Sequence, residues 1–274
     1  MRTIVHLSDI HFGRIEPDLV HRLSAAIVRI APDLLAVSGD LTQRAKRSEF
    51  TEARTFLDAL PFPRLVVPGN HDVPLYDVLR RFLSPLARYR RFIDDSLCPF
   101  VELPGVAVLG INTARSLTFK DGRINRDQVD FIRETFARVA SDKMRIIVTH
   151  HPLFALEVGG EVERAIGRQE LALDVVEEAG VDVLLAGHNH HASSQDASDL
   201  VTRAGGVLVV QAGTATSTRV REQEQSFNVI DIDDGSVAVT VHGWDGSAFR
   251  PNQTQPYKYR DGRWQILKAE EPAH

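Results

Sequence analysis

The sequence has almost no cysteine: Cys98 is the single one among 274 residues. One cysteine cannot form an intrachain disulfide, and it excludes a cysteine-based zinc site. We therefore interpret Cys98 as a structural thiol. Any metal site in this protein must be built from oxygen and nitrogen ligands.

Long apolar runs are also absent. No run approaches the ~20 residues that span a bilayer. Residues 1–7 begin a strand pattern at once and lack the apolar core of a signal peptide. We expect a cytoplasmic protein that does not associate with membranes.

The chain has no excess of positive charge. It carries 32 Lys and Arg against 37 Asp and Glu, a formal net charge of −5. This balance gives no general attraction to nucleic acid, which we do not expect as a partner. An anionic substrate must instead be held by local charge, such as metal ions.

Short apolar runs alternate with helical patterns through the first two thirds of the chain, which favours a single α/β domain over residues 1–274. Strands are expected at 3–7, 34–37, 64–67, 106–109, 145–148 and 183–186. Helices are expected at 18–31, 48–60, about 125–140 and 170–179. The portion from about 205 to 274 is β-rich, with Asp234-Gly235 as a hairpin turn.

Residues 75–93 have a helical pattern that Pro85 should break or kink. This stretch holds five arginines, which we interpret as a solvated helix face rather than a phosphate-binding surface. They are Arg80, Arg81, Arg88, Arg90 and Arg91.

Metal-competent side chains follow five of the apolar strands. They are Asp9 with His11, Asp40, Asn70 with His71, His150 with His151, and His188 with His190. Open α/β sheets bind ligands at the carboxyl ends of their strands. A single histidine in such a place is more often structural, but five coincident strand ends predict a shared site.

These ligands are too many for one ion and about enough for two. Mixed oxygen and nitrogen ligands suit Mn, Fe, Zn, Co or Ni better than Ca or Mg. Two ions roughly 3.5–4 Å apart polarise a phosphoryl oxygen and lower the pKa of a bridging water. The implied reaction is hydrolysis of a phosphate ester.

The same segments resemble the five motifs of the calcineurin-like metallophosphoesterases, in the order of that family. The segments are Asp9-x-His11, Gly39-Asp40, Gly69-Asn70-His71-Asp72, His150 and Gly187-His188-x-His190. Their form is most similar to the bacterial class III cyclic nucleotide phosphodiesterases. The resemblance implies a four-layer α-β-β-α sandwich with mixed sheets and a dimetal site at one edge of the β layers.

The resemblance also implies a ligand set for two ions, of which Mn or Fe is favoured. The first ion would take Asp9, His11, Asp40 and His190, and the second would take Asp40, Asn70, His150 and His188. Asp40 would bridge them. The adjacent His151 remains an alternative to His150.

Further roles follow from the same resemblance. His71 would contact the substrate phosphate or protonate the leaving oxygen, and Asp72 would fix its tautomer. Asn112 and His191 flank the motifs and are candidate substrate contacts. Arg219 could bind an anionic substrate or lie in an ordinary surface loop.

The favoured function is a phosphodiesterase that uses a metal-bridging water or hydroxide on a small anionic ester such as a cyclic nucleotide. Alternatives are a phosphomonoesterase and a hydrolase of a lipid-linked pyrophosphate. The second of these enzymes would need an exposed apolar lid to bind the lipid. Phe82, Leu83, Leu86 and Phe92 are candidates for that lid. A non-catalytic protein-binding scaffold is disfavoured because none of the predicted ligands is missing from the sequence. A homodimer is compatible with each interpretation.

Overall fold

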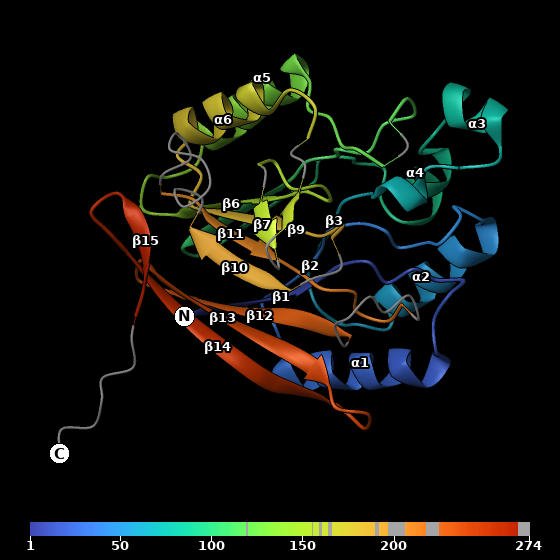
Figure 1. The fold of residues 1–274 in the computed structure, drawn as a ribbon, viewed down its shortest axis with the longest axis horizontal. Helices are drawn as coiled ribbons and strands as arrows, with labels where there is room; N and C mark the ends of the chain where they lie inside the picture. Colours follow the sequence, from blue (N-terminus) through green and yellow to red (C-terminus); the bar gives the residue numbers. More distant parts are fainter. Residues whose placement is uncertain are drawn as a thin grey trace.

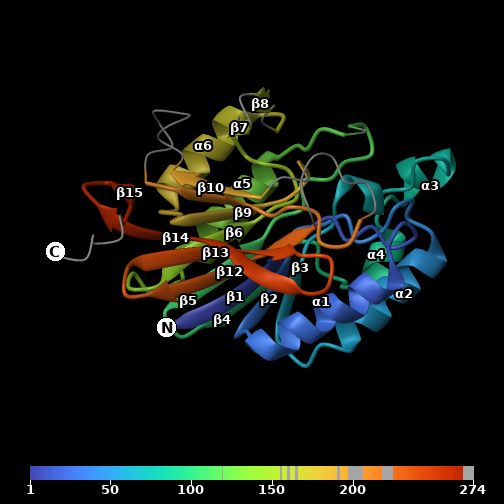
Figure 2. The same cartoon turned by 60° about the horizontal axis from the view of Figure 1, so that its bottom comes forward.

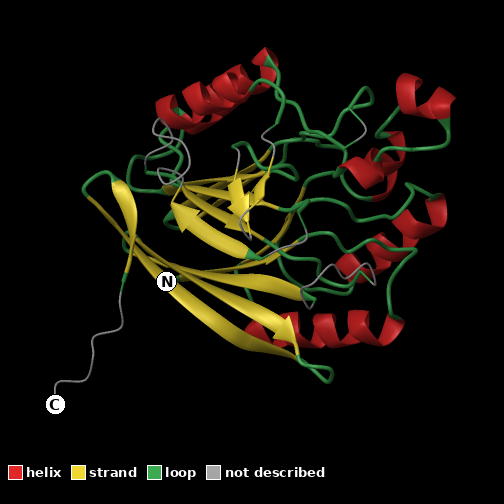
Figure 3. Ribbon diagram, in the orientation of Figure 1, coloured by secondary structure: helices red, strands yellow, loops and turns green. Residues whose placement is uncertain are grey.

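Two mixed β-sheets lie face to face, with helices on their outer sides (Figure 1). The computed structural model describes residues 1–118, 120–154, 156–158, 161–163, 166–189, 192–196, 206–217 and 225–267. Figure 3 shows the strands in the interior and the helices outside them. The predicted four-layer α-β-β-α sandwich with mixed sheets is confirmed.

The first sheet joins the two ends of the described chain. Its strand order within the described residues is β15-β14-β13-β12-β1-β2-β3. The strands are β1 (Arg2–Leu7), β2 (Leu34–Val37), β3 (Arg64–Val66), β12 (Ser226–Asp233), β13 (Ser236–Trp244), β14 (Phe249–Arg260) and β15 (Arg263–Ile266). β1, β2 and β3 are parallel, whereas β12 pairs antiparallel with β1.

The second sheet has the order β10-β11-β9-β6-β5-β4. Its strands are β4 (Phe100–Leu103), β5 (Val106–Gly110), β6 (Met144–Val148), β9 (Val183–Ala186), β10 (Ser193–Asp196) and β11 (Leu208–Gln211). The inner strands β5, β6, β9 and β11 are parallel. A separate small pair consists of β7 (Leu156–Val158) and β8 (Glu161–Glu163).

The helices lie on opposite sides of the two sheets (Figure 2). α1 (Pro17–Ile30), α2 (Arg47–Asp58) and α4 (Ala87–Phe92) pack on the first sheet, and α5 (Arg126–Phe136) and α6 (Gln169–Glu178) pack on the second. α3 (Val78–Leu83) precedes α4, and Pro85 lies between them as predicted. Asn125 caps α5 by accepting a hydrogen bond from the Gln128 N–H at 2.9 Å.

Three apolar layers hold these elements together because successive strand side chains point to opposite faces. Val5 and Leu7 pack toward the helices of the first sheet. Ile4 packs between the sheets, in the same layer as Val108 and Ile146. Both faces of the inner strands are therefore apolar, as their nearly continuous hydrophobic sequences indicate.

Arg81 corrects the expectation of a fully solvated arginine face on residues 80–91. Its side chain is only 2% exposed. It donates hydrogen bonds to the carbonyl oxygens of Ser116 at 2.8 Å and Pro74 at 3.0 Å. Arg81 thus ties α3 to the loop that follows β5.

None of the described helices is both long enough and apolar enough to cross a membrane.

His6 provides a test of the core between the sheets. It is fully buried on β1, 2.8 Å from the Ser38 hydroxyl, and burial lowers the pKa of His6 to about 3. Below about pH 6.5 the unfolded chain binds a proton that the native ring excludes, so stability falls as the pH decreases from 6.5 toward 3. The contribution reaches ~1.4 kcal/mol per pH unit.

We therefore expect the free energy of unfolding of metal-free His6→Gln to depend less steeply on pH between about 6 and 4 than that of wild type. Urea denaturation at several pH values measures both slopes. His21→Gln, on an exposed position of α1, is the matched control and should keep the wild-type slope. Equal slopes for His6→Gln and wild type would contradict a neutral buried His6.

Candidate metal centre

The carboxyl ends of the parallel strands from both sheets meet at one edge of the molecule. The main-chain N–H of His188, after β9, donates to Asp9 Oδ2, after β1, at 3.0 Å. His150, after β6, places Nδ1 2.8 Å from the carbonyl oxygen of Ser38, after β2. The two sheets are therefore joined directly at the predicted site.

A first group of ligand atoms comes from the first sheet. Asp9, His11 and Asp40 are buried, and their ligand atoms lie within 4.8 Å of one another. His11 Nε2 lies 3.4 Å from Asp9 Oδ1 and 3.8 Å from Asp40 Oδ2. One imidazole between two carboxylates is a donor set that suits a transition-metal ion.

A second group surrounds His150 Nε2. This atom lies 3.0 Å from Asn70 Oδ1, 3.4 Å from Asp40 Oδ1 and 3.2 Å from His188 Nδ1. Since His150 Nδ1 donates to the Ser38 carbonyl, neutral His150 presents a lone pair on Nε2. Two ring nitrogens at this separation need a proton or a cation between them, so the residues present fit a metal ion.

Asp40 lies between the two groups. Its Oδ2 faces His11, and its Oδ1 faces His150 and accepts the His71 main-chain N–H at 2.8 Å. This is the position that a bridging carboxylate would need. The structure therefore brings together Asp9, His11, Asp40, Asn70, His150 and His188, six of the seven predicted ligands.

The electrostatics of the site favour cations around Asp40. Burial opposes its ionisation, but His150, His71 and His11 hold the pKa of Asp40 below its usual range. Burial likewise favours neutral His150, yet Asp40 outweighs it and raises the pKa of His150 to about 9. A metal ion would replace the proton on His150, because a ligating imidazole must be deprotonated.

Four of the predicted ligands have left-handed backbone conformations. The φ angles are +52° at Asp9, +56° at His11, +52° at Asp40 and +76° at His188. This region is uncommon for residues other than glycine and persists where surrounding contacts enforce it. These backbone conformations direct the side chains into the site, and they lower the local stability of the turns.

Two glycines permit the close approach of these turns. A Cβ atom on Gly69 would lie 2.1 Å from Asp40 Oδ1, and one on Gly187 would lie 1.8 Å from the Ser8 hydroxyl oxygen. Neither contact could relax without moving a ligand-bearing turn.

His151 uses both ring nitrogens within the protein. Nε2 donates to the Lys120 carbonyl oxygen at 2.8 Å, and Nδ1 lies 2.8 Å from the Thr113 hydroxyl, which can donate to it. Burial and the neighbouring His150 and His188 keep the pKa of His151 well below its usual value. Although His151 lies close to His150 and His188, its hydrogen bonds favour His150 as the ligand.

His71 lies at the rim of the site. Its Nδ1 is 2.9 Å from the carbonyl oxygen of Gln43 and donates to it, while Gln43 Nε2 lies 3.2 Å away. Its Nε2 makes no hydrogen bond with the described residues, and its ring lies edge-on to His11 at a centroid distance of 4.9 Å. His71 therefore presents Nε2 beside the ligand groups.

Asp72 has a different partner from the predicted one. Among the described residues no hydrogen bond joins its carboxylate to the His71 ring, and the expectation that it fixes the His71 tautomer is wrong, since Gln43 occupies that place. Its carboxylate accepts the main-chain N–H groups of Gly69 at 2.9 Å, Thr42 at 2.9 Å and Leu41 at 3.2 Å. Burial, with the charge of Asp40, raises the pKa of Asp72 to about 6.

Asn112 lies in a neighbouring cavity rather than within the ligand groups. It is 5% exposed, and its Oδ1 accepts the Ala114 N–H at 2.9 Å. Its role in substrate binding stays a prediction. The predicted site residues His190, His191 and Arg219 lie outside the described residues.

Sequence reasoning missed three residues that support the site. Ser38 orients His150, Gln43 orients His71, and Thr113 holds His151. Ser38 could have been found from its place at the end of β2, just before Gly39-Asp40. Nothing in the sequence singles out Gln43 or Thr113, because their contacts join segments that are distant along the chain.

A two-sheet sandwich with two ligand groups at the carboxyl ends of its strands defines the metallophosphoesterase class. Residues 2–192 match the family model described as calcineurin-like phosphoesterase, and the chain belongs to this family. The match places the chain in the family that the motifs predict.

The proteins that are similar to this chain include two curated relatives and one solved structure. A probable cyclic nucleotide phosphodiesterase of Synechococcus sp. is 25% identical over 168 residues, 60% of this chain and 60% of the relative. The glycerophosphodiester phosphodiesterase GpdQ of Enterobacter lignolyticus is 37% identical over 202 residues, 69% of this chain and 70% of the relative.

The structure of purple acid phosphatase PPD1 from yellow lupin (Lupinus luteus) seeds superposes with a TM-score of 0.70 at 14% identity. The match covers 92% of this chain and 53% of the lupin chain. At this identity the likeness supports the fold alone.

Replacing Asp40 should affect both ligand groups at once. We expect Asp40→Ala to lose most of its metal at both positions, because each group loses one oxygen ligand. Elemental analysis of the reconstituted protein measures this, and wild type should approach two ions per chain. Asp95→Ala removes the same charge at an exposed position and should keep the wild-type metal content. Full metal content in Asp40→Ala would rule out the shared-ligand position.

Proposed function

We propose that this protein is a dinuclear metal-dependent phosphodiesterase that hydrolyses a small anionic ester such as a cyclic nucleotide. The observation that carries the proposal is the position of Asp40, whose two oxygens face separate ligand groups. The names of the two curated relatives, both phosphodiesterases, support the same reaction.

Two ions held here would polarise a phosphoryl oxygen and lower the pKa of a water molecule. One ion would be held by Asp9, His11 and His190, and the other by Asn70, His150 and His188. Asp40 would bind both ions. Nitrogen and oxygen donors without sulfur suit Mn or Fe, with Zn, Co and Ni as alternatives.

His71 would deliver the proton to the leaving oxygen. Its Nδ1–H is held by the Gln43 carbonyl, so a proton on Nε2 would face the substrate. A positioned general acid is worth typically ~10²–10⁴-fold in rate. The ring needs no carboxylate partner to keep this orientation.

Asp72 would act as a positioning residue. Its carboxylate accepts hydrogen bonds from Leu41 and Thr42, directly after Asp40, and from Gly69, directly before Asn70. It thereby fixes the turn that carries Asp40 against the turn that carries Asn70 and His71.

The proposal describes a cytoplasmic protein whose residues 1–274 act as one domain. A homodimer is compatible with it, and light scattering of the purified chain would measure the oligomeric state.

A second candidate is a hydrolase of a lipid-linked pyrophosphate. The observation that favours it is the exposed apolar surface of α3, where Leu79 is 72%, Phe82 50% and Leu83 75% exposed. Two of the proposed lid residues do not belong to this surface, since Leu86 is buried and Phe92 packs against the core.

Initial rates of the manganese-loaded protein separate these candidates. The panel should contain cyclic nucleotides, glycerophosphodiesters, nucleoside monophosphates and a lipid-linked pyrophosphate. We expect the highest kcat/KM on a small phosphodiester. A clear preference for the monophosphates or for the lipid-linked pyrophosphate would replace the phosphodiesterase assignment.

His71→Ala should separate proton delivery from metal binding. We expect a loss of about 10²–10⁴-fold on a diester with an alkoxide leaving group, and a much smaller loss on a nitrophenyl diester, whose phenolate leaves without protonation. The metal content should not change, because His71 lies outside both ligand groups.

His21→Ala is the matched control for this experiment and should retain full activity on both diesters. An equal loss on the two leaving groups in His71→Ala would remove the general-acid role. A lowered metal content would instead place His71 among the ligands.

A further inference from the structure

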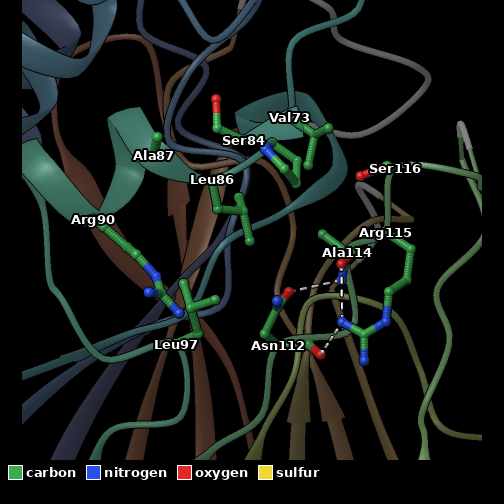
Figure 4. A pocket seen from close by; sticks show the side chains of 11 residues that line it. Val73, Ser84, Leu86, Ala87, Arg90, Leu97, Asn112, Ala114, Arg115 and Ser116 are labelled. Carbon is green, nitrogen blue, oxygen red and sulfur yellow. Dashed lines mark hydrogen bonds between the residues drawn. The ribbon is translucent and has the colours of Figure 1, made fainter. Parts of the chain in front are cut away.

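A cavity of about 340 Å³ lies between α4 and the loop that follows β5. Figure 4 shows Arg90 and Arg115 on opposite sides of it, with Asn112 between them. Val73, Leu86, Leu97 and Ala114 make much of the wall apolar. Val73 directly follows the Asn70–Asp72 turn, so the cavity begins beside the turn that carries His71.

A second cavity of about 340 Å³ shares Arg115 and Ser116 with the first. Arg123 and Arg168 line it as well, together with Leu117, Thr118 and Asn125. No aspartate or glutamate is among the described residues that line either cavity. Three guanidinium groups without a carboxylate are unexpected in a chain with a net charge of −5.

The Arg115 side chain is fixed by neutral groups. Its Nη1 donates to the carbonyl oxygens of Asn112 and Ala114, each at 3.1 Å, and its Nη2 donates to the Gln128 side chain. Gln128 also belongs to the cap of α5, so a regular element holds the guanidinium in place. Burial, reinforced by the charge of Arg123, lowers the pKa of Arg115.

Neither Arg123 nor Arg168 forms an ion pair with a carboxylate of the described chain. Asp127 and Glu170 line an adjacent hollow that Arg168 also borders. On the other side, Arg168 lines the second cavity together with Arg115 and Arg123. A bound anion would relieve this concentration of positive charge.

His151 connects this loop to the metal centre. Lys120 and Thr113 supply its two hydrogen-bond partners, and a Cβ on Gly122 would lie 2.5 Å from the ring. The ring centroid of His151 is 4.7 Å from that of His150 and 4.6 Å from that of His188. The His151 ring thus lies between the loop that carries Arg115 and Arg123 and the side chains of His150 and His188.

Resting on the proposed phosphodiesterase function, we propose that Arg115, Arg123 and Arg168 bind a second phosphate group on the substrate. The first cavity would hold the alcohol part of the ester, and the three arginines would hold a phosphate at its far end. Guanidinium groups suit this task because their paired N–H donors match phosphate oxygens. The inference narrows the substrate class to small phosphodiesters that carry a further phosphate monoester.

A matched pair of substrates tests this inference. Adenylyl-adenosine and its 5′-phosphorylated form contain the same diester and differ by one terminal phosphate. We expect the manganese-loaded wild type to show a kcat/KM at least about tenfold higher for the phosphorylated form, mainly through KM, since a charged hydrogen bond has about that value.

Arg123→Gln and Arg168→Gln should each reduce this preference by about tenfold. The readout is the ratio of the two substrates within each variant, so a partial loss of folded protein cancels. Arg22→Gln, an exposed position on α1, removes the same charge and should keep the wild-type ratio.

Hydrolysis of bis(4-nitrophenyl) phosphate distinguishes a failure of the second-phosphate site from a failure of the proposed function. If wild type hydrolyses this diester but shows equal kcat/KM for the two dinucleotides, the second-phosphate site is overturned and the proposed function stands. An unchanged preference in both arginine variants would also overturn the site. If no diester is hydrolysed, the proposed function falls and the inference falls with it.

Discussion

The buried carboxylate of Asp40 is the constraint on which the site depends. An ionised carboxylate removed from water is costly unless cations or hydrogen-bond donors surround it. Here His11 and His150 face its two oxygens, and the His71 main-chain N–H donates to one of them. These groups come from the turns after β1, β6 and β3, so they surround the charge when the two sheets are packed together. Metal binding would use the same geometry.

The supporting contacts share one feature: main-chain groups of one turn form hydrogen bonds with a side chain of another turn. The Ser38 carbonyl orients His150, the Gln43 carbonyl orients His71, and Asp72 gathers the N–H groups of two turns. Such contacts depend on backbone position more than on side-chain identity. The geometry of the site is therefore set by the backbone positions of these turns.

The sequence predicted the parts of the molecule that periodicity and strand ends determine. The predicted ligands Asp9, Asp40 and His150 could be placed because each follows a buried apolar strand, and parallel strands end at the same edge. β14 lies within the portion predicted to be β-rich, but its bounds were not predicted, and its Pro251 and Pro256 are unfavourable inside a central strand. β13 pairs with β14, and the register of this pairing shifts between Val241 and His242, opposite Pro251. The partner of Asp72 was wrong because it depends on how two loops pack, which local pattern does not specify.

The hydrogen bond between His188 and Asp9 joins residues that are 179 positions apart. Another bond joins the Thr214 hydroxyl to the Asp9 carbonyl oxygen at 2.8 Å, across 205 positions. A contact of such long sequence separation closes a large loop, which costs conformational entropy and slows folding. Asp9, which follows β1, is also synthesised long before the partners that hold it. A nascent chain released before β9 would lack His188 and could not assemble this centre.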